Sequence, residues 1–331
     1  MFGIDILIKK VLLLTVMVIL GFIMRKCKLA DENVSKGFAN TVIYLSQPAM
    51  IIYGFLEADF SREIILTSLC VFVFAMLFHI GFYGISLLLY KGALEKQRAV
   101  LRFATVFTNA GFMGIPLISE LISPVAAVYA TFYVVAFNIF NWSLGCYIYT
   151  KDRRYMRVKK MLLNPATIPT YIGLALFLVG GLVTVPDSVN PILDNFIVPI
   201  IVDDVLFLLK CTVIPLSMMM IGIRLADGDF KSTFKDRYMP VMFAVRLIVI
   251  PLIVLAVMKC VELTGLIPEN ILTPAATVLI ISASTPVAAM ATVLAEKFDG
   301  DATYASKLVS ASTLLSMVTM PLIATLITEI F

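Results

Sequence analysis

The sequence predicts an all-α integral membrane protein with ten transmembrane helices in two inverted five-helix repeats. Three observations support this prediction: the composition, the spacing of the apolar stretches, and two prolines deep inside apolar helical stretches. Of the 331 residues, 60% are hydrophobic and only 15% are charged, and the mean hydropathy is +0.99. A soluble chain of this length needs far more polar surface.

Ten apolar stretches are long enough to cross a bilayer, which takes about 20 residues. The predicted spans, numbered 1 to 10 in chain order, are 5–24, 38–56, 64–90, 99–121, 124–149, 166–184, 198–221, 239–261, 273–295 and 303–328. Little chain remains between them for a soluble domain. The first stretch is long and no small-residue cleavage site follows it, so we expect no cleavable signal peptide.

Basic residues indicate the orientation of the spans. Most of the 26 lysines and arginines fall in or beside the loops that follow spans 1, 3, 5, 7 and 9. The positive-inside rule places these loops in the cytoplasm, and both termini then lie outside the cell membrane. The net charge of +4 is therefore a signal of membrane orientation and implies no nucleic-acid partner.

The predicted spans divide five and five at the basic loop 151–164, which gives a first repeat over 1–150 and a second over 165–331. Because five is odd, the second repeat enters the membrane with the opposite orientation. Landmark prolines recur at a nearly constant offset. Pro48 in span 2 corresponds to Pro215 in span 7, and Pro116 in span 4 corresponds to Pro286 in span 9. Chance placement among 15 prolines is the alternative.

Pro116 and Pro286 are expected to break spans 4 and 9. Proline removes a backbone donor and clashes with the preceding turn. In hydrocarbon, the freed backbone groups are tolerated only where protein or a watery cavity receives them. Two such breaks at matching positions in two repeats predict the substrate site of a secondary transporter. A helix kink stabilised by small and polar side chains is the alternative.

The residues around the two breaks suit a small organic anion such as a carboxylate. The N-terminal ends of half-helices present unpaired amides and a partial positive charge. Asn109, Ser284 and Thr285 can donate hydrogen bonds, and Gly111 allows a close approach. Asn138 and Asn141 share one face of span 5, where ligand contact and hydrogen bonding between helices are equally supported.

Ionisable residues within the predicted spans are candidates for proton or ion coupling. His79 is the single histidine, and it is read either as a proton relay or as a hydrogen-bonded structural residue. Lys210 lies about two helical turns from Asp203 in span 7. Arg246 in span 8 is interpreted as structural or as snorkelling to the cytoplasmic surface, with anion binding as the alternative.

Other classes of function have weaker support. A channel-like or structural membrane protein is the main alternative, and an intramembrane hydrolase using Ser86 and His79 is a third. No His-Glu-x-x-His or phosphate-loop motif occurs. Carboxylates do not cluster as a metal site requires, so we expect no metal and no cofactor. Sodium coupling through backbone carbonyls stays open.

Several short segments together form a specific pattern. They are Asn109–Pro116, Asn164–Pro165, Ile214–Gly222, Arg246–Pro251, Ser284–Glu296 and Thr319–Pro321. This pattern resembles the auxin efflux carrier family, which is related in fold to the plant PIN exporters and the sodium–bile acid symporters. The resemblance covers essentially the whole chain. It implies that helices 3–5 and 8–10 form a bundle that moves like an elevator against a scaffold of helices 1, 2, 6 and 7.

The resemblance also implies site residues and a class of substrate. Members of the family carry organic anions, among them auxin, malate and malonate. By this resemblance the crossing prolines are Pro116 and Pro286. The residues expected to contact the substrate are Asn109, Ser46 and either Asn138 or Asn141. The long cytoplasmic loop of the plant proteins is reduced here to about 150–164. The substrate, the direction of flux and the coupling ion do not transfer, and a homodimer through the scaffold helices stays open.

Overall fold

The computed structural model describes residues 4–57, 61–156, 168, 171–176, 200–227 and 236–331. These residues are helical apart from short connections, and an isolated antiparallel bridge joins Thr108 to Val287. Predicted span 6 and the loop 151–164 lie largely outside the described residues.

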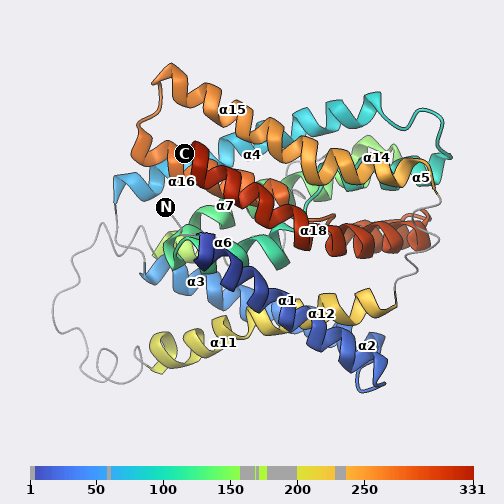
Figure 1. Cartoon of the computed structure of the whole chain (residues 1–331), viewed down its shortest axis with the longest axis horizontal. Helices are drawn as coiled ribbons and strands as arrows, with labels where there is room; N and C mark the ends of the chain where they lie inside the picture. Colours follow the sequence, from blue (N-terminus) through green and yellow to red (C-terminus); the bar gives the residue numbers. More distant parts are fainter. Residues whose placement is uncertain (1–3, 58–60, 157–167, 169–170, 177–199, 228–235) are drawn as a thin grey trace.

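One group of helices comes from predicted spans 1, 2 and 7 and occupies the lower part of the view in Figure 1. It consists of α1 (Ile4–Lys26), α2 (Glu32–Thr41), η1 (Val42–Ser46), α3 (Gln47–Glu57), η6 (Ile200–Leu206), α11 (Phe207–Cys211) and α12 (Val213–Ala226). Two glycines let α1 and α12 touch. A Cβ atom on Gly21 would collide with the backbone of Met219, and a Cβ on Gly222 would collide with the backbone of Val18.

A second group packs against the first and lies above it in Figure 1. It consists of α4 (Arg62–Leu88), α5 (Glu95–Val106), η2 (Ala110–Gly114), α6 (Ile115–Leu121), α7 (Pro124–Phe140), η3 (Asn141–Gly145), α8 (Cys146–Thr150), η4 (Arg153–Met156), α14 (Tyr238–Ala244), η7 (Val245–Val249), α15 (Ile250–Thr264), α16 (Glu269–Ser284), α17 (Met290–Lys297) and α18 (Ala302–Ile330). Within this second group, α6, α7 and α18 lie closest to the first group. The elements η1, η2, η3, η6 and η7 are π-helical turns, whereas η4 is a 3₁₀ turn.

Five helices of the described chain are long and apolar enough to cross a membrane. They are Arg62–Leu88, Val125–Thr150, Asp204–Ala226, Tyr238–Thr264 and Ala302–Ile330, and they correspond to predicted spans 3, 5, 7, 8 and 10. Helix also covers predicted spans 1 and 2 in α1 and from α2 to α3. The chain is therefore an all-helical membrane protein.

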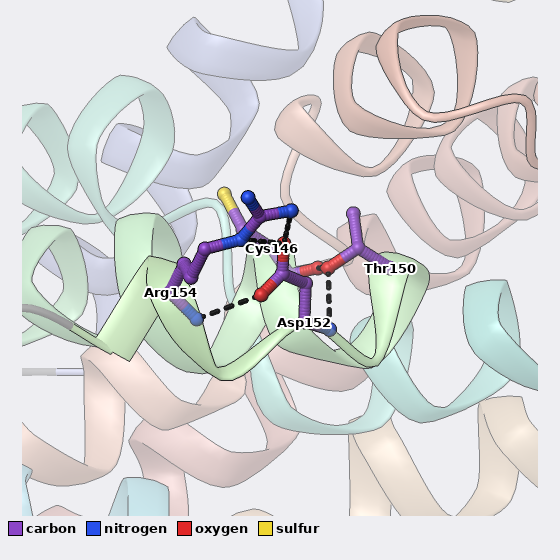
Figure 2. Close-up of polar contacts among 4 residues, drawn as sticks. All are labelled: Cys146, Thr150, Asp152 and Arg154. Carbon is purple, nitrogen blue, oxygen red and sulfur yellow. Dashed lines mark hydrogen bonds and ion pairs between the residues drawn. The ribbon is translucent and has the colours of Figure 1, made fainter.

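The basic segment after predicted span 5 begins with a capped helix end (Figure 2). The Thr150 hydroxyl donates to the carbonyl of Cys146 at 2.9 Å and accepts from the amide of Asp152 at 3.1 Å. The Asp152 carboxylate in turn accepts from the amide and the Nε of Arg154, each at 2.8 Å. Lys151 between them has a left-handed φ of 58°, which ends α8 and turns the chain.

Candidate functional site

The first break lies before Pro116 and not at it. Helix α5 ends at Val106, and Phe107 is extended with φ −103° and ψ 123°. Helical structure resumes at Ala110 in η2, and Pro116 lies in the first turn of α6. Gly114 before α6 is itself helical, so Pro116 lies within a continuous helical run, and the π-helical turn η2 comes directly before its missing N–H. The expectation that Pro116 itself breaks the helix is therefore wrong: the unwound residues precede it.

The second break falls at the predicted proline. Helix α16 ends at Ser284, and Thr285 is extended with φ −65° and ψ 152°. The ring of Pro286 disfavours helical geometry in the residue before it, which accounts for this conformation. Helix resumes in α17 at Met290.

The two breaks pair with each other through their backbones. The amide of Asn109 donates to the carbonyl of Pro286 at 2.8 Å, and the amide of Ala288 donates to the carbonyl of Phe107 at 3.1 Å. The amide of Val287 donates to the Ser312 hydroxyl of α18 at 3.1 Å. Several amides that sequence reasoning left unpaired therefore have protein partners, and nothing in the local sequence pointed to Ser312.

A buried arginine lies directly beside the breaks. Arg246 of η7 is 0% exposed. Its Nη2 donates to the carbonyls of Ala283 at 2.7 Å and Thr285 at 3.2 Å, and its Nη1 lies 3.4 Å from the carbonyl of Thr105. These carbonyls belong to the C-terminal ends of α5 and α16, which carry partial negative charge. The snorkelling interpretation of Arg246 is therefore wrong, and a fixed positive charge lies beside the breaks.

The predicted donors at the breaks are buried. Asn109 is 5% exposed. The Ser284 hydroxyl donates to the carbonyl of Ile280 at 2.7 Å and the Thr285 hydroxyl to that of Ser282 at 2.8 Å, so both protons are engaged within their own segment. The hydroxyl oxygens remain as acceptors, and of the three side chains only the Asn109 carboxamide keeps N–H donors for a ligand.

The carbonyl of Gly111 accepts from Nε2 of Gln47 in α3 at 3.4 Å, which joins the first break to the lower helices. A Cβ on Gly111 would lie 3.4 Å from the same nitrogen, so the absent side chain makes room for this approach. Gln47 precedes Pro48 in the sequence, and no local signal there points to its contact with the break.

Several buried polar atoms near the breaks have no protein partner in the described chain. They are Nδ2 of Asn138, Oδ1 of Asn141, and the hydroxyls of Thr108, Tyr133 and Ser282. The hydroxyls of Tyr133 and Thr108 lie near each other without hydrogen-bond geometry. Buried polar atoms of native proteins are nearly always paired with protein, water or ligand, so this cluster is suited to binding.

Among the candidate coupling residues, His79 contacts a residue of the first break. Its ring stacks on Phe140 with 5.3 Å between centroids and lies 5.8 Å from the ring of Phe107, a residue of the first break. Its Nδ1 lies 2.7 Å from the carbonyl of Ala75. Because a carbonyl only accepts, Nδ1 carries the proton, and Nε2 is left without a partner in the described chain.

Ser46 and Lys210 belong to the lower helices. The hydroxyls of Ser46 and Thr212 lie 2.6 Å apart and join η1 to the residue before α12. The Lys210 ammonium lies 3.6 Å from the centroid of the Tyr53 ring, a cation–π contact. The side chain of Asp203 lies outside the described residues.

The Ser86–His79 pair does not form a hydrolase dyad. The Ser86 hydroxyl donates to the carbonyl of Tyr83 at 2.7 Å, and His79 bonds to that of Ala75. Each side chain is thus engaged with its own helix, whereas a nucleophile and its base must lie within hydrogen-bond reach.

A small apolar cavity of about 20 Å³ lies between the lower helices and the helices α6 and α18. Its lining residues are Leu14, Thr15, Val18, Met113, Leu117, Met218, Ser316, Met317, Met320 and Pro321. Met113 belongs to η2, so the cavity opens beside the first break.

The sequence model of the family described as membrane transport protein matches residues 6–159 and 153–324. No curated protein matches the chain. The two matched segments cover nearly the whole sequence, so the chain is a membrane transporter and belongs to the membrane transport protein family, that is, the auxin efflux carrier family.

Proposed function

We propose that this transporter moves a small organic anion, a carboxylate, across the cell membrane and binds it where the two helix breaks pair. The observation that carries the proposal is the pairing itself, in which Asn109 and Pro286 share a backbone hydrogen bond of 2.8 Å. Irregular backbone at membrane depth is tolerated where it lines a binding cavity. Asn109 is buried, and Asn138 and Thr108 each hold a buried polar atom without a partner in the described chain.

The proposed architecture has ten spans in two inverted repeats, 1–150 and 165–331. Helices 1, 2, 6 and 7 form the scaffold, and helices 3–5 and 8–10 form the moving bundle. The separation of the α1, α3, α11 and α12 group from the α4, α5, α15 and α16 group supports this division (Figure 1). Both breaks and Arg246 then lie on the moving bundle, which carries the anion by elevator-type alternating access.

Burial and hydrogen-bond partners support the proposed assignments of individual contacts. Asn109 is the primary donor to the carboxylate, with Gly111, Ser284 and Thr285 shaping the site between Pro116 and Pro286. Either Asn138 or Asn141 is a second contact, and Ser46 is a candidate contact from the scaffold. For coupling, His79 has the best support because it contacts Phe107 of the first break, while Lys210 and Asp203 stay as scaffold candidates.

Counterflow in proteoliposomes tests the proposed function. Purified protein is reconstituted, the vesicles are loaded with an unlabelled carboxylate, and uptake of the same labelled carboxylate is followed. A carrier gives saturable uptake that internal substrate accelerates, because the bundle returns loaded. Uptake that rises linearly with the external substrate concentration and does not depend on internal substrate would indicate a channel. A prior thermal-shift screen of mono- and dicarboxylates identifies the compound to use, since a ligand of the folded state raises apparent stability.

A further inference from the structure

Three basic side chains, Arg98, Arg102 and Lys151, gather where α5 begins and α8 ends, and together they form the basic cluster. Arg98 and Arg102 are four residues apart on α5, so they share one face of that helix. Lys151 follows the last residue of α8. Burial and the nearby charge of Arg102 lower the pKa of Lys151, and the charge of Arg98 acts in the same direction. The three cations therefore lie close enough to repel one another, an arrangement that a bound anion would relieve.

The carboxylates nearby do not neutralise the basic cluster. Glu95 is the acidic group that acts on Lys151, but within the described chain no ion pair joins it to a residue of the cluster. Asp152, the residue after Lys151, pairs with the guanidinium of Arg154 at 2.8 Å (Figure 2). Three positive charges against the single charge of Glu95 leave a net charge of about +2 at this place.

Several donors of the basic cluster lack a partner. Nε of Arg98 and Nε of Arg102 are both buried without a hydrogen-bond partner in the described chain. Arg98 donates from Nη2 to the carbonyl of Ala93 at 2.6 Å, and Lys151 donates to that of Ile148 at 2.9 Å. Among the described residues Arg102 makes no hydrogen bond at all. A guanidinium only donates, and its planar fork matches the oxygens of a phosphate group.

An exposed apolar face of α4 leads to the basic cluster. Leu77, Ile80 and Leu87 are exposed and lie three and seven residues apart, so they share one helix face. Tyr83 lies three residues after Ile80 and four before Leu87 on that face, and its hydroxyl interacts electrostatically with Arg102. Tyrosine is enriched where a membrane meets water. The cations therefore lie at the end of a surface that suits acyl chains.

We propose that Arg98, Arg102 and Lys151 bind the phosphate group of an anionic phospholipid whose acyl chains lie along the exposed face of α4. The cluster lies at the ends of predicted spans 3, 4 and 5, on the side predicted to face the cytoplasm, where basic pockets between helices suit anionic headgroups. A zwitterionic headgroup would bring its own cation to a place that already holds excess positive charge. The site is separate from the paired breaks and does not depend on the proposed function.

Thermal unfolding of the intact protein in detergent, with and without added lipid, tests the site. Phosphatidylglycerol should raise the apparent unfolding temperature, because a ligand of the folded state stabilises that state, and phosphatidylcholine with the same acyl chains should not. Without lipid, Arg102→Gln should be at least as stable as the unmodified protein, since it removes a repelled cation that makes no hydrogen bond in the described chain. With phosphatidylglycerol, the unmodified protein should be the more stable of the two.

Native mass spectrometry measures the lipid that each variant retains. We expect phosphatidylglycerol to bind about 5-fold more weakly to Arg102→Gln and about 30-fold more weakly to the double variant Arg98→Gln with Arg102→Gln. The matched control is Lys28→Gln with Lys36→Gln. It removes the same charge from the same predicted side of the membrane, but at exposed residues of the lower helices.

Equal losses in the two double variants would indicate a general attraction of lipid to basic surface and would overturn the proposal. Equal stabilisation by phosphatidylcholine, or unchanged lipid retention in Arg102→Gln, would overturn it as well. Inorganic phosphate separates a lipid headgroup from a soluble ligand. Stabilisation by inorganic phosphate that equals that by phosphatidylglycerol and is lost in Arg102→Gln would assign the basic cluster to a soluble phosphate and refute the lipid.

Discussion

The backbone amide of Asn109 donates to the carbonyl oxygen of Pro286 across 2.8 Å, so the break in one apolar helix is closed by the break in another. These residues are far apart in the sequence and belong to different predicted repeats. Each break alone would expose unpaired backbone groups in the membrane, at several kcal/mol per group. The two breaks therefore stabilise each other, and a substitution that distorts one break also weakens the hydrogen bonds of the other.

The Ser312 hydroxyl is expected to hold the second break in place. It accepts from the buried amide of Val287 at 3.1 Å. Ser312→Ala leaves that amide unpaired and should lower the free energy of unfolding by about 1–3 kcal/mol. Ser316→Ala is the control on the same helix, since the Ser316 hydroxyl only donates to the carbonyl of Thr313 in its own helix. Unfolding in detergent measures both, and equal effects would contradict this role.

The crossing of α1 and α12 is expected to tolerate no side chain at Gly222. A Cβ there would collide with the backbone at Val18, which cannot move aside as a flexible side chain does. Gly222→Ala should cost about 1–3 kcal/mol of stability. In α4, a Cβ on Gly81 meets no atom of the described chain within 4 Å. Gly81→Ala should therefore be neutral or stabilising by up to about 1 kcal/mol, and a comparable loss there would contradict the packing argument.

Hydropathy alone predicted the helices that are long enough to span a membrane, because long apolar segments are more stable in the bilayer than in water. The proline Pro286 predicted the place of the second break, since its ring acts locally on Thr285. The first break was misplaced at Pro116. No proline lies between 107 and 109, and the unwinding there follows from pairing with the Pro286 segment, a contact between distant parts of the chain.

The position of Arg246 was hidden from the sequence for the same reason. An arginine in an apolar helix can snorkel or can bind buried carbonyls, and its own neighbours do not decide between them. The deciding partners, Thr105 and Ala283, come from two other helices. The importance of Asn109, in contrast, was expected from its place beside a predicted break, although its role in binding stays a prediction.

The cap of α2 is expected to make stability depend on pH. Asp31 accepts from the amide of Val34 at 2.9 Å, and this bond lowers the pKa of its carboxyl below the ordinary value. A lowered pKa adds stability that is present above the unfolded pKa of about 4 and is lost as the pH falls through the lower folded value. The protein should therefore exceed Asp31→Asn in stability at neutral pH, and the difference should shrink below about pH 4. Thermal unfolding in nanodiscs across pH measures this, and a difference that grows on acidification would contradict it.

Two single cysteines test the orientation of the spans. Leu266, in the loop after predicted span 8, is 81% exposed, and the Arg154 side chain after span 5 is 82% exposed. Losing the exposed Arg154–Asp152 ion pair should leave folding intact, because such pairs contribute little. With the five native cysteines replaced, an impermeant maleimide should label Leu266→Cys from outside only and Arg154→Cys from the cytoplasmic side only. Labelling of both from the same side would refute the predicted topology.

Asn109→Ala tests binding at the breaks with little effect on the fold. The bond to Pro286 comes from the backbone amide, so it survives loss of the side chain. The conformation of Asn109, with φ −83° and ψ 43°, is not left-handed and does not exclude alanine. The substitution removes the carboxamide and with it a hydrogen bond to the charged carboxylate of the substrate. Such a bond contributes about 1.5–3 kcal/mol.

That loss corresponds to roughly 10- to 150-fold weaker carboxylate binding. Titration calorimetry with the carboxylate found by the thermal-shift screen measures it, and counterflow should show the same shift in half-saturation. Asn33→Ala is the control, because Asn33 is an exposed asparagine of α2 that lies away from the breaks. Asn138→Ala and Asn141→Ala, tested in the same way, identify which of the two contacts the anion. If folded Asn109→Ala binds as tightly as the unmodified protein, the paired breaks are a structural kink and the anion binds elsewhere.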